Sequence, residues 1–216
     1  VHMKGREDAE EIRRLLSLCG IRVISMPGGG SNWEDIMAAP SASLNIVVRD
    51  ELGLSLAKQM ERDFGTPYMS SGLPYGTDGT MAWLSEIIEK LGAGELIRAS
   101  HEAAKLKEFL LRKGNNLESL WGPLWFDAVL ISAPPSEALG IAEAIRSEWI
   151  DTARLCIHAQ CETKKSTPAA DAIRVVMKNE KEIAKDYKDW QGGLVLSSSH
   201  ETHLLLRMGR SFTGFH

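Results

Sequence analysis

Apolar positions along the first half of the chain switch repeatedly between helical spacing and short continuous runs. Helical spacing predicts helices over 7–18 and over 51–64, where Leu52, Leu56 and Met60 repeat every four residues. Asn32 is expected to be the N-cap of a short helix that ends near residue 38, and a further helix is predicted over 78–91. Short β-branched or apolar runs predict strands over 21–25, 44–48 and 67–70. Three strand and helix units in this order predict one small parallel sheet.

The second half of the chain repeats this plan after a long charged helix. That helix is predicted over 95–113, and Gly92-Ala93-Gly94 precedes it as a boundary. Beyond it we predict strands over 126–132, 152–158 and 193–197, and helices over 136–149, 169–179 and 200–208. The expected fold class is α/β, with two Rossmann-like, three-layer parallel-sheet lobes at 1–93 and 115–216 joined by a bridging helix at 94–114.

Composition narrows the class of protein. Hydrophobic residues make up 44% of the 216 residues and charged residues 25%, which is typical of a globular protein. A net charge of −4 argues against an obligatory nucleic-acid or anionic-membrane partner, and no apolar run is long enough to span a bilayer. Three cysteines without a disulfide framework favour a reducing, cytoplasmic location.

Three segments of the chain carry a resemblance to a known family. The first runs from Asn45 through the Gly65-Thr-Pro turn and the Leu73-Pro-Tyr-Gly-Thr-Asp-Gly-Thr loop to Trp83-Leu-Ser-Glu-Ile. The second is Phe126-Asp-Ala-Val-Leu-Ile-Ser-Ala-Pro-Pro-Ser-Glu-Ala-Leu-Gly, and the third is Gly193-Leu-Val-Leu-Ser-Ser-Ser-His-Glu. In this order they resemble the component 1 family of nitrogenases, which includes the dark-operative protochlorophyllide reductase and related tetrapyrrole reductases.

The resemblance implies a fragment that covers the middle domain and part of the last domain of such a subunit. In the family, the first domain supplies the cysteines for an iron-sulfur cluster, so we expect no cofactor in this chain and a cluster in the full-length assembly. The implied partners are a homologous component 1 subunit and a P-loop, ATP-dependent iron-sulfur reductase.

The resemblance also exposes a departure at Arg49. In the cofactor-bearing nitrogenase subunit, a cysteine at this matched position ligates the metal cofactor. Arginine stays protonated and has no lone pair to donate to a metal. The departure favours a tetrapyrrole-reductase-like, a non-cofactor or an uncharacterised branch of the family.

Two loops of the first half are candidate binding sites. Arg49 sits where a strand meets its helix and could hold a substrate carboxylate; the alternative is a surface ion pair beside the capping carboxylates of Asp50 and Glu51. The loop at Gly28, Gly29 and Gly30 could present N–H groups to an anionic cofactor. It lacks the G-x-G-x-x-G spacing, so a simple turn is the favoured interpretation.

Candidates in the second half also have structural alternatives. Ser136 is expected to cap a helix beside Ser132 and Glu137. His200 could protonate a substrate near neutral pH, although a structural role is favoured. A possible metal cluster, which lacks a fourth ligand, consists of Cys156, His158 and Cys161. Trp121, Trp125 and Phe126 are interpreted as packing anchors.

These observations predict part of an oxidoreductase subunit that forms substrate-cleft walls and subunit contacts and is inactive alone. The alternative is a non-catalytic binding or cofactor-assembly scaffold for a metal chelate or tetrapyrrole. If the strand-end rule holds in both lobes, four residues should lie on loops at carboxyl ends of strands and line a shared crevice. They are Arg49, Tyr75, Ser132 and His200.

Overall fold

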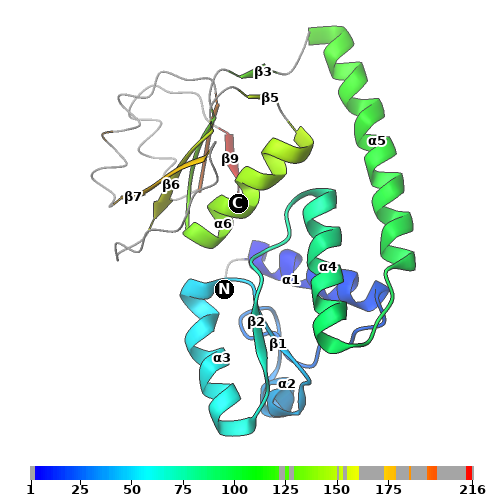
Figure 1. The fold of residues 1–216 in the computed structure, drawn as a ribbon, viewed down its shortest axis with the longest axis vertical. Coiled ribbons are helices and arrows are strands. Elements are labelled where there is room, and N and C mark those ends of the chain that lie inside the picture. Colours follow the sequence, from blue (N-terminus) through cyan, green and yellow to red (C-terminus); the bar gives the residue numbers. More distant parts are fainter. Residues whose placement is uncertain are drawn as a thin grey trace. The chain divides into compact units, whose positions relative to one another are not determined.

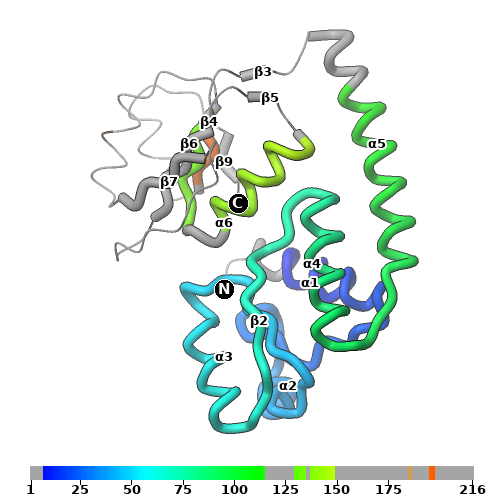
Figure 2. The backbone as a smooth tube through the Cα atoms, viewed as in Figure 1, coloured from blue at the N-terminus to red at the C-terminus, as the bar shows by residue number. Residues whose placement is uncertain are grey.

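The computed structural model of the chain describes residues 3–121, 125–126, 129–149, 151–152, 155–160, 173–178, 185, 194–198 and 213–215 (Figures 1 and 2). The chain divides into two compact units, Val1–Gly114 and Asn115–His216. The long helix α5, Ile97–Trp121, runs across this division. Each unit is described by itself below.

The first unit contains a two-stranded parallel sheet with helices on both faces (Figure 1). Its elements, besides α5, are α1 (Met3–Leu18), α2 (Trp33–Ala38), the 3-10 turn η1 (Ala39–Ser41), β1 (Asn45–Val47), α3 (Asp50–Phe64), β2 (Tyr68–Ser70) and α4 (Gly76–Leu91). The strands pair with Ile46 opposite Met69. On one face α3 packs through Ala57 and Gly53, where an added Cβ would lie 3.2 Å from Val47.

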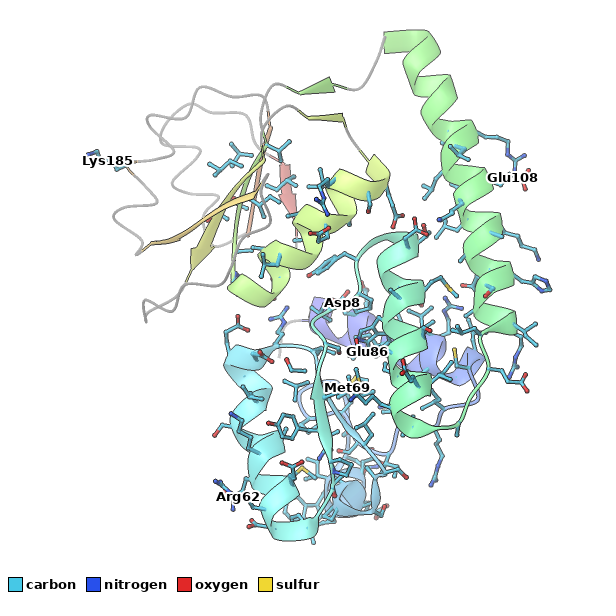
Figure 3. All side chains as sticks on the ribbon, in the orientation of Figure 1. Asp8, Arg62, Met69, Glu86, Glu108 and Lys185 are labelled. Carbon is cyan, nitrogen blue, oxygen red and sulfur yellow. The ribbon has the colours of Figure 1, made fainter. Side chains whose placement is uncertain are left out.

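The core of the first unit lies on the other face of this sheet. Its buried members come from α1 and the residue that follows it, from β2, from α4 and from the start of α5, and they are Leu16, Cys19, Met69, Trp83, Leu84, Ile87 and Ala99. Figure 3 shows Met69 between its strand and these helices. The helical spacing of 84, 87 and neighbouring positions gives α4 the apolar stripe that the sequence predicts.

One predicted strand of the first unit is wrong. Residues 21–26 belong to no helix and pair with no strand in the part of the chain that the structure describes. Ile21 and Val23 instead pack against the core by their side chains, and the Val23 carbonyl accepts a hydrogen bond from Nη1 of Arg13 at 3.3 Å. This β-branched segment therefore makes no backbone hydrogen bonds to a neighbouring strand of the described chain. The sheet has two strands in place of the expected three.

Helices α1 and α5 are joined by a charged network on the surface of the first unit. Arg14 donates to both carboxylate oxygens of Glu102, at 2.9 and 2.5 Å, and its Nε donates to Glu11 at 2.7 Å. The hydrogen bond from Arg14 holds the pKa of Glu102 below its ordinary value. The pair is about half exposed, so its contribution to stability is at most about 1 kcal/mol.

Because of this network, we expect the free energy of unfolding to decrease slightly as the pH becomes acidic. Because the folded pKa of Glu102 is depressed, the stabilisation is present above the ordinary glutamate pKa and disappears as the pH falls through the lower folded value. We expect Glu102→Gln to lower the free energy of unfolding near neutral pH and to make no difference in strong acid. Urea unfolding of both proteins across this pH range measures the effect, and an undiminished difference in strong acid would contradict it.

The second unit contains a five-stranded sheet in the order β7-β6-β4-β8-β9, with every neighbouring pair parallel. Its strands are β4 (Val129–Ala133), β6 (Leu155–Gln160), β7 (Ile173–Lys178), β8 (Leu194–Ser198) and β9 (Thr213–Phe215). A separate short pair consists of β3 (Trp125–Phe126) and β5 (Asp151–Thr152). Helix α6 (Pro135–Ala144) continues into a π-helical turn η2 (Ile145–Trp149). Every residue of β4 is buried, as expected for a strand covered on both faces.

The α/β fold class is confirmed, but several elements of the second unit differ from expectation. The predicted helix at 169–179 is wrong, because 173–178 form β7 beside β6. Three residues of this segment, Ile173, Val175 and Val176, are β-branched and favour a strand. The segment therefore pairs with β6, although its apolar positions also have helical spacing. The strand expected at 126–132 is split into β3 and β4. The helix predicted at 200–208 lies outside the described residues.

Within the part of the chain that the structure describes, no helix combines the length and apolarity needed to cross a membrane.

Candidate functional site

The carboxyl ends of β1 and β2 bring two predicted site residues to one edge of the first sheet. Arg49 follows β1 and is the N-cap residue of α3, and Tyr75 follows β2 and is the N-cap residue of α4. Because β1 and β2 are parallel neighbours with Val47 opposite Ser70, both helices start at the same edge. Arg49 and Tyr75 are each half-buried.

Hydrogen bonds fix the backbone on both sides of this edge. The Arg49 carbonyl accepts from the N–H groups of Gly53, at 2.8 Å, and Leu52, at 3.1 Å, which starts α3. The Ser70 hydroxyl donates to Oδ1 of Asp50 and so ties the end of β2 to the first turn of α3. The backbone at Arg49 is therefore fixed by hydrogen bonds within α3, and the first turn of α3 is fixed to the end of β2.

A second tie holds the loop that leads to Tyr75. The Ser71 N–H extends the ladder to the Val47 carbonyl at 3.1 Å. Its hydroxyl accepts a hydrogen bond from Nε1 of the buried Trp83 at 2.9 Å. The start of the loop between β2 and α4 is thus anchored to the core of the first unit. This anchor restrains the loop that leads to Tyr75.

The electrostatics of this edge are mixed. Neither Arg49 nor Tyr75 caps its own helix through its side chain, so both first turns direct backbone N–H groups toward the edge. Arg49 adds a permanent positive charge, whereas Asp50 and Glu51 place carboxylates in the first turn of α3. An anionic group at this edge would be attracted by Arg49 and by the two helix N-termini and repelled by the carboxylates of Asp50 and Glu51.

The glycine loop packs against the rest of the first unit. Gly28 and Gly30 adopt φ values of 78° and 91°, and the Gly29 N–H donates to the Met26 carbonyl at 2.9 Å. A Cβ at Gly29 would lie 2.8 Å from the Cβ of Ala9 and 2.7 Å from the side chain of Met26. Close packing against α1 thus gives Gly29 a structural role, and the proposed cofactor contact stays a prediction.

The helix after this loop, α2, is capped at its N-terminus by the side chains of Asn32 and Asp35. The Asn32 side chain accepts from the Asp35 N–H at 2.8 Å, and the Asp35 carboxylate accepts from the Asn32 N–H at 3.0 Å. This capping box confirms Asn32 as an N-cap. It also places a carboxylate at the start of α2, which disfavours an anion there.

The second unit has its own strand-end position between β4 and β8. The chain passes from β4 to β6 and β7 on one side and then to β8 and β9 on the other, so the topological switch point lies between β4 and β8. Ligands of such sheets bind outside the carboxyl ends of these strands. Here the polypeptide turns at Pro134 into α6, whose first turn contains the buried side chain of Glu137.

Two predictions at this position need correction, and a third is not tested. Ser132 is not on a loop: it lies inside β4, fully buried, opposite Ser197. Ser136 is not the N-cap of α6, because Pro134 is the N-cap and Pro135 starts the helix, as its fixed φ allows. His200 lies outside the described residues.

The predicted cysteine cluster is described only in part. Cys156 and His158 lie on alternate positions of β6, and Cys161 is outside the described residues. Among the described residues, no group of three or more His, Cys, Asp or Glu side chains could hold a metal ion. Trp121, Trp125 and Phe126 are placed by backbone only, in α5 and β3.

A small cavity of about 270 Å³ lies elsewhere in the first unit, between the end of α1 and the start of α5. Its lining includes Cys19, Gly94 and Arg98 and none of the predicted site residues. Burial raises the pKa of the Cys19 thiol, so this thiol is less reactive than an exposed one.

The sequence did not reveal the two serine contacts, Ser70 with Asp50 and Ser71 with Trp83. The available signal was the position of the two serines at the end of a strand, Ser70 as its last residue and Ser71 directly after it, which is common to many strand ends. Their partners lie on other elements, so no local spacing identifies them.

Comparison with known proteins identifies a family that matches nearly the whole chain. The model of the family described as nitrogenase component 1 type oxidoreductase matches residues 2–214. A light-independent protochlorophyllide reductase chain from Chloroherpeton thalassium is 35% identical over 88 residues, which are 41% of this chain and 16% of that protein. A nitrogenase iron-molybdenum cofactor biosynthesis protein NifE from Nostoc sp. is 25% identical over 201 residues, 89% of this chain and 40% of that protein.

Solved structures agree on the fold. A structure described as nitrogenase Cp1 at pH 6.5 superposes with a TM-score of 0.69 at 15% identity, over 98% of this chain and 50% of that chain. The chain thus spans about half the length of that solved relative, and 16% to 40% of the two curated relatives.

Proposed function

This chain belongs to the nitrogenase component 1 type oxidoreductase family, and we propose that it forms the substrate-cleft walls of a subunit in a cytoplasmic assembly of that kind. In this proposal a P-loop, ATP-dependent iron-sulfur reductase supplies the electrons, and a homologous component 1 subunit completes the site. The residues of this chain bind and orient the substrate and exclude water. Alone, the chain is inactive.

One observation carries the proposal: Arg49 and Tyr75 begin two helices at the same edge of a parallel sheet. Strand ends of this kind are where α/β sheets bind ligands. A guanidinium on a rigid backbone offers paired hydrogen bonds to a carboxylate, and the Tyr75 phenol adds a donor. We propose a substrate with carboxylate arms, of the tetrapyrrole class, at this edge.

The described residues do not fit an iron-sulfur cluster, because they offer no set of cysteine ligands. Arg49 is also unsuited to coordinate a metal. In the proposed assembly, the cluster would be held by domains or subunits beyond these residues. We expect the purified chain to be colourless.

A cofactor-assembly scaffold is the second candidate, favoured by the match to a NifE protein over 89% of the chain. In that function the same edge would hold an anionic metal cofactor for transfer to another protein, without turnover. The two functions differ in whether reductase and ATP convert the bound ligand into product.

The proposal predicts a loss of substrate affinity on substitution of Arg49. In the full-length assembly, Arg49→Ala should weaken binding of protochlorophyllide by about 1.5–3 kcal/mol, the usual contribution of a hydrogen bond to a charged group. Arg49→Lys should recover only part of it, because an ammonium cannot pair bidentately with a carboxylate. The measurement is a titration of the pigment's absorbance, followed by turnover with reductase and ATP.

Arg22→Ala is the matched control, because Arg22 is an exposed arginine of the same unit that belongs to no predicted site. The control should bind pigment like the wild type. Pigment binding unaffected by Arg49→Ala would remove Arg49 from the site. Binding of a metal cofactor with no pigment binding or turnover would favour the scaffold.

A further inference from the structure

Helix α2 presents an apolar face to solvent. Trp33, Ile36 and Met37 share one face because they stand at positions i, i+3 and i+4. Their exposed fractions are 72%, 41% and 63%, and no residue of α2 is buried. A six-residue helix without a packed face is marginal, and here the capping box at Asn32 supports it. Exposed tryptophan and methionine on one face are typical of a protein interface.

The surroundings of this α2 face are acidic. Residues 31–42 contain two carboxylates, Glu34 and Asp35, and no lysine or arginine. The Asp35 carboxylate is engaged in the capping box, whereas Glu34 is an exposed residue next to Trp33. A surface that covers the α2 face should therefore be apolar at its centre and positively charged at its rim.

The middle of α5 has this character. Leu106, Phe109, Leu110 and Lys113 stand at positions i, i+3, i+4 and i+7 and define the α5 face. The three apolar side chains are 46%, 48% and 47% exposed. Nζ of Lys113 lies 5.6 Å from the centre of the Phe109 ring, so its charge lies over this face.

The charges of the two faces are opposite. Residues 105–113 contain four basic residues and one acidic residue, a net charge of +3, against −2 for residues 31–42. Lys107 pairs with Asp78 of α4, and Arg112 pairs with Glu108 at 3.7 Å. Figure 3 shows Glu108 on the side of α5 away from α4. The positive charge that borders the α5 face comes from Lys113 together with Lys105.

We propose that the α2 face of one copy of this chain docks on the α5 face of a second copy. Within the first unit, which contains both faces, each is exposed, so neither covers the other. Opposite charge and matching apolar centres favour the contact between copies. In a two-fold dimer each copy offers α2 to its partner, and this symmetry closes the assembly.

The size of the contact sets the expected strength. Buried aromatic side chains contribute about 150–250 Å² each, so two α2–α5 contacts would bury on the order of 1,000 Å² in the dimer. That area is near the lower limit for a specific interface, and we expect a dimer that dissociates on dilution. The inference does not depend on the substrate or reaction proposed above.

Sedimentation velocity of the full chain over a range of concentrations tests the dimer. We expect reversible dimerisation, with a dissociation constant raised at least tenfold by Trp33→Ser or Phe109→Ser. Leu111→Ser is the matched control, because Leu111 is 67% exposed on the opposite side of α5. It should leave the dissociation constant unchanged.

A charge exchange distinguishes this contact from other associations. Glu34→Lys and Lys113→Glu should each weaken the dimer, and the two variants mixed together should associate more strongly than either alone. A monomer at every concentration, a dimer indifferent to Trp33→Ser, or mixing without recovery would overturn the proposal. The proposal would also be overturned if substitutions in the α5 face lowered the thermal stability of a monomer and had no effect on association. That result would show that residues of the same chain cover the α5 face.

Discussion

Leu84→Ala should lower the free energy of unfolding by about 2–5 kcal/mol, the usual cost of truncating a buried leucine. Leu84 has no exposed surface and packs in the core between α4, α1 and β2. Removal of its side chain leaves a cavity that Trp83 and Ile87, held by the same helix, cannot fill without moving α4. Urea unfolding followed by circular dichroism measures the change.

Leu52→Ala is the matched control for this prediction. Leu52 is 74% exposed on α3, so the same truncation should change the free energy of unfolding by no more than about 0.5 kcal/mol. Equal effects of the two substitutions would show that Leu84 is not in a packed core, or that Leu52 is covered in the protein.

Gly94→Ala should destabilise the chain by at least about 1–3 kcal/mol, the cost of holding a non-glycine residue in a sparsely populated backbone conformation. Gly94 has a φ of 116°, in the region that glycine adopts freely. An added Cβ would also lie 3.1 Å from the Cys19 carbonyl oxygen and 3.0 Å from Ile88. Any shift that relieves this contact disturbs the hydrogen bond from the Glu95 N–H to the same carbonyl.

Gly79→Ala provides the opposite case in the same unit. Gly79 lies inside α4 with no atom within 4 Å of an added Cβ, so alanine should stabilise the helix by up to about 1 kcal/mol. Thermal unfolding of the two variants should therefore shift in opposite directions. A shift of Gly94→Ala toward higher temperature would contradict the conformation assigned to the 92–96 turn.

Much of the local structure was accessible from the sequence, because it depends on neighbouring residues. The helical spacing of Leu52, Leu56 and Met60 and the turn at Gly65 predicted α3, and Asn32 was recognised as an N-cap from its position before α2. The parallel α/β class followed from the alternation of strands with helices. The resemblance in three segments identified the family, which the match over residues 2–214 confirms.

Pairing between strands could not be determined from local pattern. The runs at 21–25 and 173–178 are both rich in β-branched residues, yet the first packs without a ladder and the second forms β7. A segment of this kind forms a strand only where a neighbouring strand offers N–H and C=O groups that still lack partners. The residues of the segment itself do not determine whether such a neighbour is present. Similarly, Ser132 became an interior strand residue because β4 extends to Ala133 between β6 and β8.

The sequence by itself determined the α/β class, most helices of the first unit and the placement of Arg49 and Tyr75 after strands, since all of these depend on spacing along the chain. Only the tertiary structure decided that Ser70 and Ser71 support the edge where both residues lie, and that apolar faces of α2 and α5 remain exposed. The physical reason is that hydrogen bonds and burial join groups distant in sequence, whose meeting depends on how the whole chain packs.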